Sequence, residues 1–199
     1  MIIGISGTSG SGKSSVCALF EKADFLVVDF DKLTHTVYEN NKECIDEIKN
    51  NFFGVVKNNF IDRKELAKIV FSDKEKLALL NSIVHKYLIE ELKNIINENN
   101  EKDIILDAPL LFEANLDKMC DYTICVTCDF DKKVERIIKR DGLTLCEAKA
   151  RLKNQKDDSY FSEKCDFTIT NNDILCAKTV NDIIKKIRNG GADIKEWKK

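Results

Sequence analysis

The sequence contains a single proline, Pro109, and no proline-, glycine- or serine-rich stretch that would separate two domains. No apolar run approaches the ~20 residues that a membrane-spanning helix needs. The N-terminal residues lack the basic segment and the long apolar segment of a secretory signal peptide. We therefore expect a soluble, cytoplasmic protein whose 199 residues form one domain with room for a small inserted lobe.

An excess of charge of one sign is also absent, because 32 basic residues nearly balance 34 acidic residues for a net charge of −2. A protein that binds a polyanion usually carries a basic excess, so this balance argues against nucleic acid as a partner. Hydrophobic residues make up 43% of the chain, which is enough to fill a core of ordinary size. Disorder is therefore excluded for most of the chain.

Eight cysteines are present, but the other features of a disulfide framework are missing. The chain is long enough to build its own core, and it carries no export signal. The one close pair, Cys125 and Cys128, lies in a strand-like run, and residues three apart on a strand point to opposite faces. We therefore expect buried free thiols and neither a zinc site nor a redox pair.

Short apolar runs alternate with helix-like segments along the chain. The runs are Ile2–Ser6, Phe25–Asp29, Ile104–Asp107, Tyr122–Thr127 and Phe167–Thr170. Apolar strands separated by helices predict an α/β fold in which helices cover both faces of a parallel, five-stranded sheet. The last helix is expected at about Ile174–Arg188, with a stop at Asn189-Gly190-Gly191.

About 70 residues separate the second run from the third, which is too long for a simple crossover. Asp62 with Glu65, and Ser72 with Glu75, are capping patterns that predict two helix starts. Apolar residues then recur with helical spacing at Leu77, Leu80, Val84, Leu88, Leu92 and Ile95. The sequence therefore predicts a helical lobe at about residues 36–101, inserted into a core of residues 1–35, 102–130 and 165–190.

Residues Gly7–Ser14 match the phosphate-loop pattern GxxxxGK[ST], between an apolar strand and a helix expected at Lys13–Lys22. Glycines let successive N–H groups turn toward phosphate oxygens, and the helix adds its positive end. Lys13 would neutralise the β- and γ-phosphates of ATP, and the Ser14 hydroxyl would ligate Mg²⁺. The residues predicted to bind the nucleotide here are Gly7, Thr8, Ser9, Gly10, Ser11, Gly12, Lys13, Ser14 and Ser15.

A phosphate loop establishes nucleotide binding but does not say which reaction follows. A GTPase needs glycine at the end of a D-x-x-G motif, and Asp107–Leu110 ends in leucine. The segment Asn154–Asp157 has glutamine where the guanine-binding motif has lysine, and it follows a charged helix. We therefore reject a GTPase, which leaves a small-molecule kinase or an ATP-driven switch.

Three carboxylates follow the expected strands. Asp29 ends the second strand and Asp31 comes two residues later, so both should lie at the edge where such sheets bind ligands. Asp31 is the candidate base that orients an acceptor hydroxyl and takes its proton, although a cap of the following helix is the alternative. Asp29 would support Mg²⁺ or fix the turn, and Asp107 could bind Mg²⁺ through water.

Positive charge over the transferred phosphoryl group is expected from arginines. Arg136 and Arg140 lie four apart on a predicted helix at Lys132–Arg140 and therefore share a face. Arg151 lies on the next helix, which a capping box at Thr144 begins. These helices predict a lid at about residues 131–160 that closes over ATP, although a solvated charged face is the alternative.

Several further motifs follow one another in a distinctive order. They are Asp29–Asp31 with His35, Asp62–Arg63 with Leu66 and Val70–Phe71, His85, Asp107–Glu113, Arg136 and Arg140, Arg151 with Gln155, and Cys165–Asp166 before Asn171. Many unrelated ATPases have a phosphate loop, but the run Pro-Leu-Leu-Phe-Glu at this distance from Asp-x-Asp is far more restrictive. Over nearly its whole length the chain resembles the dephospho-CoA kinase family.

This resemblance implies a P-loop NTPase core, an acceptor-binding helical lobe and an arginine lid. It implies ATP-dependent phosphorylation of the ribose 3′-hydroxyl of dephospho-CoA, the final step of coenzyme A synthesis. Asp31 would be the base, Lys13 and Ser14 would hold phosphate and Mg²⁺, and Arg140 would act from the lid. The residues that the resemblance assigns to substrate binding are Asp31, His35, Arg63, His85, Leu111 and Glu113.

Two readings of the function remain beside this one, namely another nucleoside or nucleotide kinase and a non-enzymatic ATP-dependent switch. The chain departs from the family pattern at Lys86, which follows His85 where proline is usual, and at Asn59, where a turn glycine is common. Neither departure removes a chemical group that the reaction requires. A monomer is compatible with the sequence, which does not predict the oligomeric state.

Overall fold

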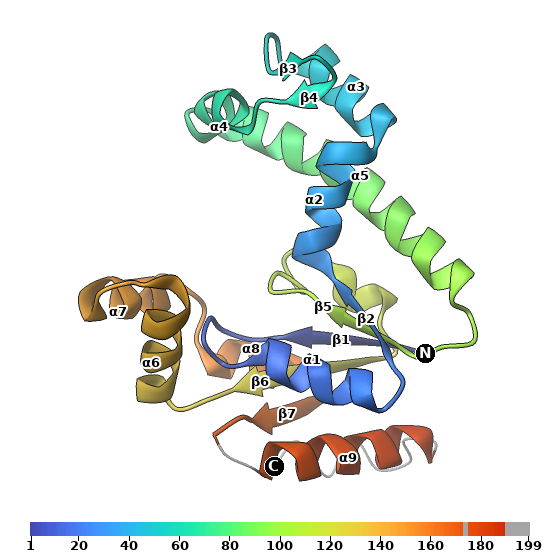
Figure 1. Ribbon diagram of the computed structural model, residues 1–199, viewed down its shortest axis with the longest axis vertical. Coiled ribbons are helices and arrows are strands. Elements are labelled where there is room, and N and C mark those ends of the chain that lie inside the picture. The colour runs from blue at the N-terminus through green and yellow to red at the C-terminus, as the bar shows by residue number, and fades with distance from the viewer. Residues whose placement is uncertain (173–174, 190–199) are drawn as a thin grey trace. The chain divides into compact units, whose positions relative to one another are not determined.

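Five strands form a central sheet in the computed structural model, which describes residues 1–172 and 175–189 (Figure 1). They are β1 (Ile2–Ser6), β2 (Leu26–Asp29), β5 (Ile104–Asp107), β6 (Tyr122–Thr127) and β7 (Phe167–Thr170). They lie in the order β2-β5-β1-β6-β7. The predicted parallel, five-stranded α/β sheet is therefore confirmed, and among the predicted strands only β2 begins one residue late, at Leu26.

The strand register decides which residues meet at the carboxyl edge of the sheet. Ile5 of β1 pairs with Asp107 of β5 on one side and with Ile124 of β6 on the other. β1 is therefore the central strand, and its end is flanked by the ends of both neighbours. Open α/β sheets bind ligands beyond this edge, and the loop that follows β1 begins there.

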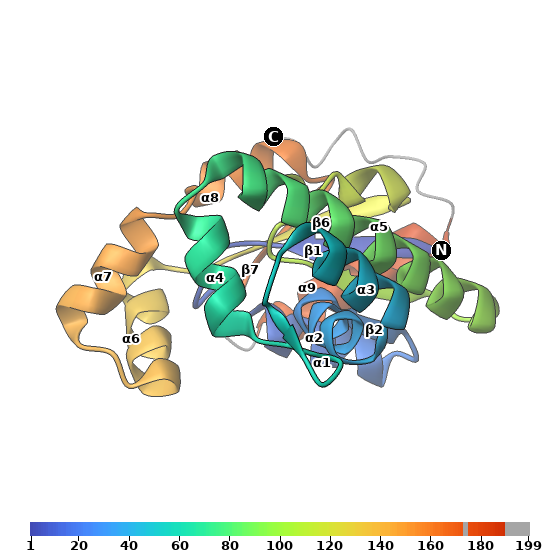
Figure 2. The same ribbon diagram turned by 90° about the horizontal axis from the view of Figure 1, so that it is seen from above.

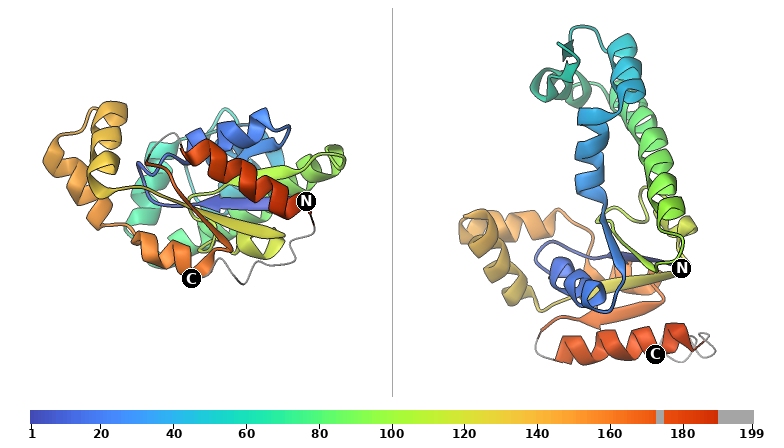
Figure 3. Two further views of the ribbon diagram at one scale, coloured as in Figure 1. Left: turned by 90° about the horizontal axis from the view of Figure 1, so that it is seen from below. Right: turned by 45° about the vertical axis from the view of Figure 1, so that its right-hand side comes forward.

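The helices α1 (Lys13–Lys22) and α9 (Leu175–Arg188) cover one face of the sheet and pack against each other (Figure 3). Their buried side chains meet alternate strand residues in one cluster that includes Val16, Phe20, Val180, Ile183, Ile3, Ile5, Ile124 and Val126. On β6, Cys125 packs instead against Phe161 of α8 (Asp158–Lys164) and against Cys165. Both faces of β6 are thus buried in its central part, which explains why Ile124, Cys125 and Val126 are consecutive apolar residues without polar alternation.

Between β6 and α8 the chain forms the helix pair α6 (Phe130–Asp141) and α7 (Leu145–Lys153). Gly142 ends α6 in the left-handed conformation, and Thr144 begins α7 with the predicted capping box. Val134, Ile137 and Ala148 form the buried contact between the two helices. The predicted start of the last helix at Ile174 and its stop at Gly190 and Gly191 lie outside the described residues.

Residues 29–101 form one of the two compact units into which the chain divides. Its helices are α2 (Phe30–Asn40), α3 (Lys42–Asn51), α4 (Arg63–Phe71) and α5 (Lys74–Glu98). The first three pack against the 25-residue helix α5, as Figure 2 shows. The residues that α5 buries include Leu80, Val84, Leu88 and Leu92, in agreement with the predicted helical period.

This unit also contains a two-stranded hairpin that no sequence pattern predicts. Strands β3 (Val56–Lys57) and β4 (Phe60–Ile61) are antiparallel and are joined by Asn58 and Asn59. These two asparagines have φ values of 50° and 64°. Asparagine tolerates this left-handed conformation better than most residues, so Asn59 fills the place of the turn glycine without disrupting the hairpin.

Two local features of α5 bear on what the sequence suggests. Asp73, not Ser72, caps the helix by accepting from the N–H groups of Glu75 and Lys76. The prediction of Ser72 as the cap was therefore wrong, and its hydroxyl instead donates to carbonyl groups at the end of α4. α5 also continues through Lys86 without a break, and the Lys86 ammonium group lies 3.1 Å from Glu47.

All eight cysteines are free thiols. Burial raises the pKa of Cys125 and of Cys165 to about 12 in each case. These two thiols therefore stay protonated and unreactive at neutral pH.

None of the helices in the described part of the chain combines the length and the apolar character that crossing a membrane requires.

Candidate active site

The phosphate loop between β1 and α1 takes backbone conformations that suit glycine. Gly10 and Gly12 have φ values of 77° and 87°. A Cβ atom at Gly12 would lie 2.1 Å from Nδ2 of Asn171, and a Cβ atom at Gly10 would lie 2.6 Å from the carbonyl oxygen of Lys133. A side chain at either position would clash as well as strain the backbone. The loop thus fits closely against α6 and against the residue that follows β7.

Two side chains hold the carbonyl groups of the loop. Nη1 of Arg136 donates to the carbonyl oxygens of Gly10 and Ser11 at 3.2 and 3.1 Å. Nδ2 of Asn171 donates to the carbonyl oxygens of Ser11 and Gly12 at 3.0 and 3.3 Å. Nη2 of Arg136 also donates to the carbonyl oxygen of Asn171 at 2.9 Å. Three consecutive carbonyl groups are therefore held by the side chains of two residues, and the Arg136 side chain is also hydrogen-bonded to the backbone of Asn171.

These contacts fix the direction of the N–H groups in the loop. The N–H and C=O groups of a trans peptide point in opposite directions. The N–H groups of Gly12 and Lys13 therefore point away from Arg136 and Asn171. Because α1 begins at Lys13, the positive end of its helix dipole lies at the same place. The loop has the partial positive charge and the directed donors of an anion-binding site.

Side chains of the loop add further polar groups. Lys13 folds back so that its Nζ donates to the carbonyl oxygen of Gly7 at 2.8 Å. Ser14 and Ser15 are exposed on the first turn of α1. Oγ of Ser11 is buried and has no hydrogen-bond partner within the described residues. An unsatisfied buried hydroxyl is costly, which makes this atom a candidate contact for a phosphate oxygen.

Residues of the helix pair and of the segment after it reach the loop at Ser9. Nη2 of Arg140 donates to Oγ of Ser9 at 3.3 Å, and Oε1 of Gln155 accepts from the N–H of Ser9 at 2.9 Å. Arg140 and Arg151 both donate to the carboxylate of Asp141. The hydrogen bond from Arg140, together with the two positive charges, lowers the pKa of Asp141. Arg140 and Arg151 thus bind the same carboxylate, that of Asp141, close to the loop.

The carboxylates that follow the strands differ in their contacts. Asp107 ends β5 and is half-buried beside Ile5. Asp29 caps α2 by accepting from the N–H of Lys32 at 3.0 Å, and its other oxygen lies 3.2 Å from the Lys32 ammonium group. Burial raises the pKa of Asp29, but these contacts with Lys32 outweigh it, so the pKa is lowered. Asp31 is exposed on the first turn of α2, and no interaction of its carboxylate occurs within the described residues.

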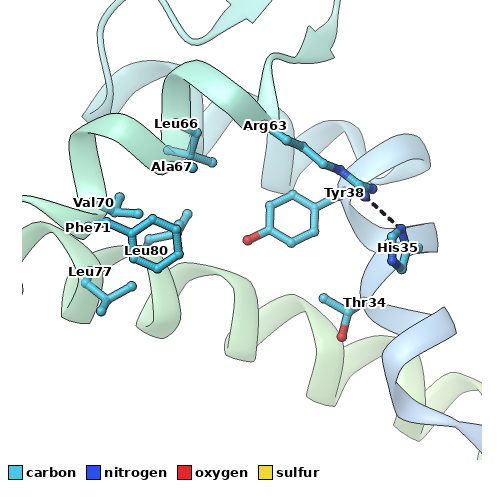
Figure 4. A pocket seen from close by; sticks show the side chains of 10 residues that line it. All are labelled: Thr34, His35, Tyr38, Arg63, Leu66, Ala67, Val70, Phe71, Leu77 and Leu80. Atoms are coloured by element: carbon cyan, nitrogen blue, oxygen red, sulfur yellow. Dashed lines mark hydrogen bonds between the residues drawn. The ribbon is translucent and has the colours of Figure 1, made fainter. Parts of the chain in front are cut away.

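A pocket of about 250 Å³ lies within residues 29–101 (Figure 4). One side is apolar and comes from α4 and α5, with Leu66, Ala67, Val70, Phe71, Leu77 and Leu80. On the other side, Nη1 of Arg63 lies 2.7 Å from Nδ1 of His35, and the Arg63 guanidinium lies 5.5 Å from the ring centre of Tyr38. Because arginine only donates, Nδ1 of His35 accepts and Nε2 carries the proton.

The family model described as dephospho-CoA kinase matches residues 1–176 of this chain. A dephospho-CoA kinase of Fusobacterium nucleatum subsp. nucleatum is 38% identical over 189 residues, which cover 94% of this chain and 95% of that protein. The crystal structure of TT1252 from Thermus thermophilus is 31% identical, with a TM-score of 0.78 and coverage of 95% and 96% of the two chains. A dephospho-CoA kinase from Campylobacter jejuni is 27% identical, with a TM-score of 0.65 and coverage of 96% and 98%.

The chain belongs to the dephospho-CoA kinase family. It is therefore a kinase that uses ATP to phosphorylate dephospho-CoA, the final step of coenzyme A biosynthesis. The resemblance that the sequence motifs suggested is confirmed, and so is the expected phosphate-loop kinase fold. The readings as another nucleotide kinase or as a non-enzymatic switch are set aside.

Several residues that the dephospho-CoA kinase pattern suggested as substrate contacts occupy different surroundings. His35 and Arg63 meet in the pocket, whereas His85 is half-buried on α5 and does not line it. Leu111 is completely buried, and its methyl groups fill the space next to the Cα of Gly4. The structure thus places the Leu111 side chain in the core, where it offers no surface to a substrate. Glu113 is exposed in the turn after β5.

The sequence predicts Arg136 in a lid over ATP and indicates no role for Asn171. In the structure both residues hold the carbonyl groups of the kinase's phosphate loop. A polar residue directly after a buried strand, as Asn171 is after β7, was the available signal. No sequence signal indicates the role of Arg136. Two arginines four residues apart on a basic helix form the same pattern whether the first side chain contacts the phosphate loop or faces solvent.

The close fit of the loop generates a prediction about ATP binding. Gly12→Ala should weaken ATP binding roughly hundredfold, or about 2.7 kcal/mol, because the new Cβ displaces Asn171 and strains the left-handed backbone. The matched control is Gly54→Ala, which has a similar φ of 78° and no atom within 4 Å of the new Cβ. Calorimetric titration with ATP measures both variants. Equal affinities for the two variants would contradict the prediction.

Proposed function

We propose that this kinase binds the triphosphate of ATP in the phosphate loop and uses Asp31 as the base for the ribose 3′-hydroxyl of dephospho-CoA. A phosphoryl acceptor must be oriented, and its proton must be accepted as the new O–P bond forms. A carboxylate can do both if it makes no competing contacts. The observation that carries the proposal is that Asp29 caps α2, whereas the Asp31 carboxylate does not take part in the cap.

The position of Asp31 in the chain supports this role. β2 and β1 belong to one parallel sheet, so their carboxyl ends lie at the same edge. Asp31 follows the end of β2 by two residues, and the phosphate loop directly follows β1. The alternative that Asp31 merely caps the helix is overturned, because Asp29 fills the cap position. The Asp31 carboxylate is left with both oxygens available to a hydroxyl group.

We assign the stabilisation of the transferred phosphoryl group to Lys13 and Arg140. Lys13 can leave the carbonyl oxygen of Gly7 for a phosphate oxygen, which is a stronger acceptor because it is charged. Arg140 already reaches Ser9 of the loop, so a bound nucleotide lies within the range of its guanidinium group. Both residues place positive charge where the negative charge of the transition state is spread over oxygen atoms.

The donor set near the loop fits Mg²⁺, which kinases use with ATP. Ser14 supplies a hydroxyl oxygen and Asp107 a carboxylate oxygen, and Mg²⁺ prefers hard oxygen ligands together with water and phosphate. When bound, the ion would neutralise charge on the β- and γ-phosphates. Both oxygens of Asp29 contact Lys32, so that residue fits its turn-fixing role better, and its assignment as a metal ligand stays a prediction.

The pocket within residues 29–101 suits the acceptor. Dephospho-CoA combines a diphosphate with a long uncharged pantetheine arm. Arg63 supplies guanidinium donors that match phosphate oxygens once Nη2 exchanges its 3.4 Å contact with Glu39 for the ligand, and the leucine-rich wall supplies apolar surface for the arm. We therefore place part of the acceptor in this pocket, with Arg63 on its diphosphate and His35 holding the guanidinium group.

The eight free thiols fit the reducing conditions of a cytoplasmic location.

The role of Asp31 gives a direct prediction. Asp31→Asn should reduce kcat for dephospho-CoA by about 10²- to 10⁴-fold, because an amide cannot accept the hydroxyl proton. The affinity for ATP should remain within a factor of about two. Asp46→Asn makes the same change at an exposed position on α3 and should leave kcat unaltered. A kcat of Asp31→Asn equal to that of Asp46→Asn would remove Asp31 from the mechanism.

The acceptor pocket gives a second prediction. Arg63→Met should raise KM for dephospho-CoA about tenfold while leaving KM for ATP unchanged, because the loss removes a charged contact to one substrate only. Lys64→Met removes the same charge at the neighbouring exposed position and serves as the control. Steady-state kinetics with each substrate varied in turn separates the effects. Equal KM values for dephospho-CoA in the two variants would refute the placement of the acceptor.

A further inference from the structure

We propose that an ion pair between the buried Lys133 and the half-buried Asp158 positions the Thr8 end of the phosphate loop for ATP. Asp158 is then a positioning residue for the kinase reaction, since it acts through Thr8 without touching substrate. The inference rests on the proposed function in one respect, namely that ATP binds in the phosphate loop. Neither the phosphate-loop pattern nor the arginines of the helix pair includes this ion pair.

The three side chains form one compact contact. Nζ of Lys133 lies 2.6 and 2.5 Å from the two carboxylate oxygens of Asp158. The hydroxyl group of Thr8 donates to Oδ1 of the same carboxylate at 3.0 Å. Lys133 and Thr8 are buried, and the Asp158 side chain is 30% exposed. The loop, α6 and α8 therefore meet at a single carboxylate.

The burial of Lys133 explains why this contact is restrictive. An ammonium group removed from water is costly unless an opposite charge and hydrogen bonds compensate it. Asp158 compensates it with both oxygens and is thereby held in place. A held carboxylate offers the Thr8 hydroxyl a fixed acceptor, and a hydrogen bond to a charged group is stronger than one between neutral groups.

α6 also contacts the loop on the other side of Ser9. The backbone of Lys133 lies against Gly10, and Arg136, one turn later, holds the carbonyl groups of Gly10 and Ser11. The loop is therefore fixed at Thr8 and again at Gly10 and Ser11. Between these points the N–H of Ser9 donates to Gln155, and the N–H of Gly10 is a donor whose position must match a phosphate oxygen. Loss of the contact at Thr8 would leave Gln155, which accepts from the N–H of Ser9, as the remaining side-chain acceptor in this half of the loop and would remove the charged one.

The test uses two variants that break the contact from opposite sides. Asp158→Asn removes the negative charge of the carboxylate that accepts from Thr8, and Thr8→Val removes the hydroxyl donor with little change in shape. Each should raise KM and Kd for ATP about tenfold, or about 1.4 kcal/mol, with KM for dephospho-CoA within a factor of two. The double variant should be no worse than the worse single variant, because both changes break one interaction. Lys139→Met, at an exposed position of α6, is the control for charge removal.

A purely structural role for the ion pair makes a different prediction. Lys133→Met with Asp158→Leu replaces the ion pair, whose lysine is buried, by apolar groups, a change that often preserves or restores stability. On our proposal this variant unfolds at a temperature close to that of the parent but keeps the tenfold weaker ATP binding. Recovery of both stability and ATP affinity, or ATP affinities within twofold of the parent in Asp158→Asn and Thr8→Val, would overturn the proposal.

The same titrations separate this proposal from the proposed function. If the Gly12→Ala variant binds ATP roughly hundredfold more weakly than the parent protein, the phosphate loop is the ATP site and the Asp158 result stands on its own. If Gly12→Ala binds ATP as tightly as the parent, the proposed function fails, and the inference about Asp158 falls with it. If only the Asp158→Asn and Thr8→Val variants bind ATP as the parent does, the inference about Asp158 fails, and the phosphate loop remains the ATP site.

Discussion

The catalytic arrangement depends on one constraint, namely that the carbonyl groups of the phosphate loop are held by hydrogen bonds from Arg136 and Asn171. A short glycine-rich segment has many accessible conformations, and most of them would point N–H groups in unrelated directions. Engaging three successive carbonyl groups removes that freedom before ATP arrives. The donors are then preorganised, so little of the binding energy is spent on ordering the loop.

This constraint connects the core of the protein to its chemistry. Asn171 directly follows β7 and Arg136 lies on α6, so both donors are as rigid as the elements that carry them. β1 delivers the loop from the centre of the same sheet, and the apolar cluster beneath α1 and α9 fixes that sheet. A change in the packing of these strands would therefore move donors and acceptors relative to one another. In this kinase the hydrophobic core acts on phosphoryl transfer through the geometry of a single loop.

Much of this arrangement follows from the sequence because the signals are local and strong. Apolar runs predicted all five strands of the sheet to within one residue, and the spacing of glycines, Lys13 and Ser14 predicted the phosphate loop. Motif order predicted the family. These features depend on few neighbours in space, so a linear pattern is sufficient to find them.

The remaining features depend on contacts that a linear pattern does not contain. The hairpin at Asn58 and Asn59 has only two residues in each strand, which is too short for a periodic signal. Ser72 and Asp73 are both good caps, and only the geometry of α5 decides between them. Lys133 and Asp158 look like surface charges in the sequence, yet tertiary packing buries the lysine and pairs the two. Leu111 in the Pro-Leu-Leu-Phe-Glu run is likewise recognisable as a motif residue, whereas its place in the core is not.

The most direct test of the central claim is the response of individual backbone amides to nucleotide. Two-dimensional ¹H–¹⁵N spectra of the labelled full chain, titrated with a non-hydrolysable ATP analogue and Mg²⁺, report each N–H group separately. If the loop binds phosphate as described, the amide protons of Gly12 and Lys13 shift downfield together and saturate at one equivalent, as expected for hydrogen bonds to phosphate oxygens. The account is contradicted if the protein binds the analogue while these two resonances stay where they are.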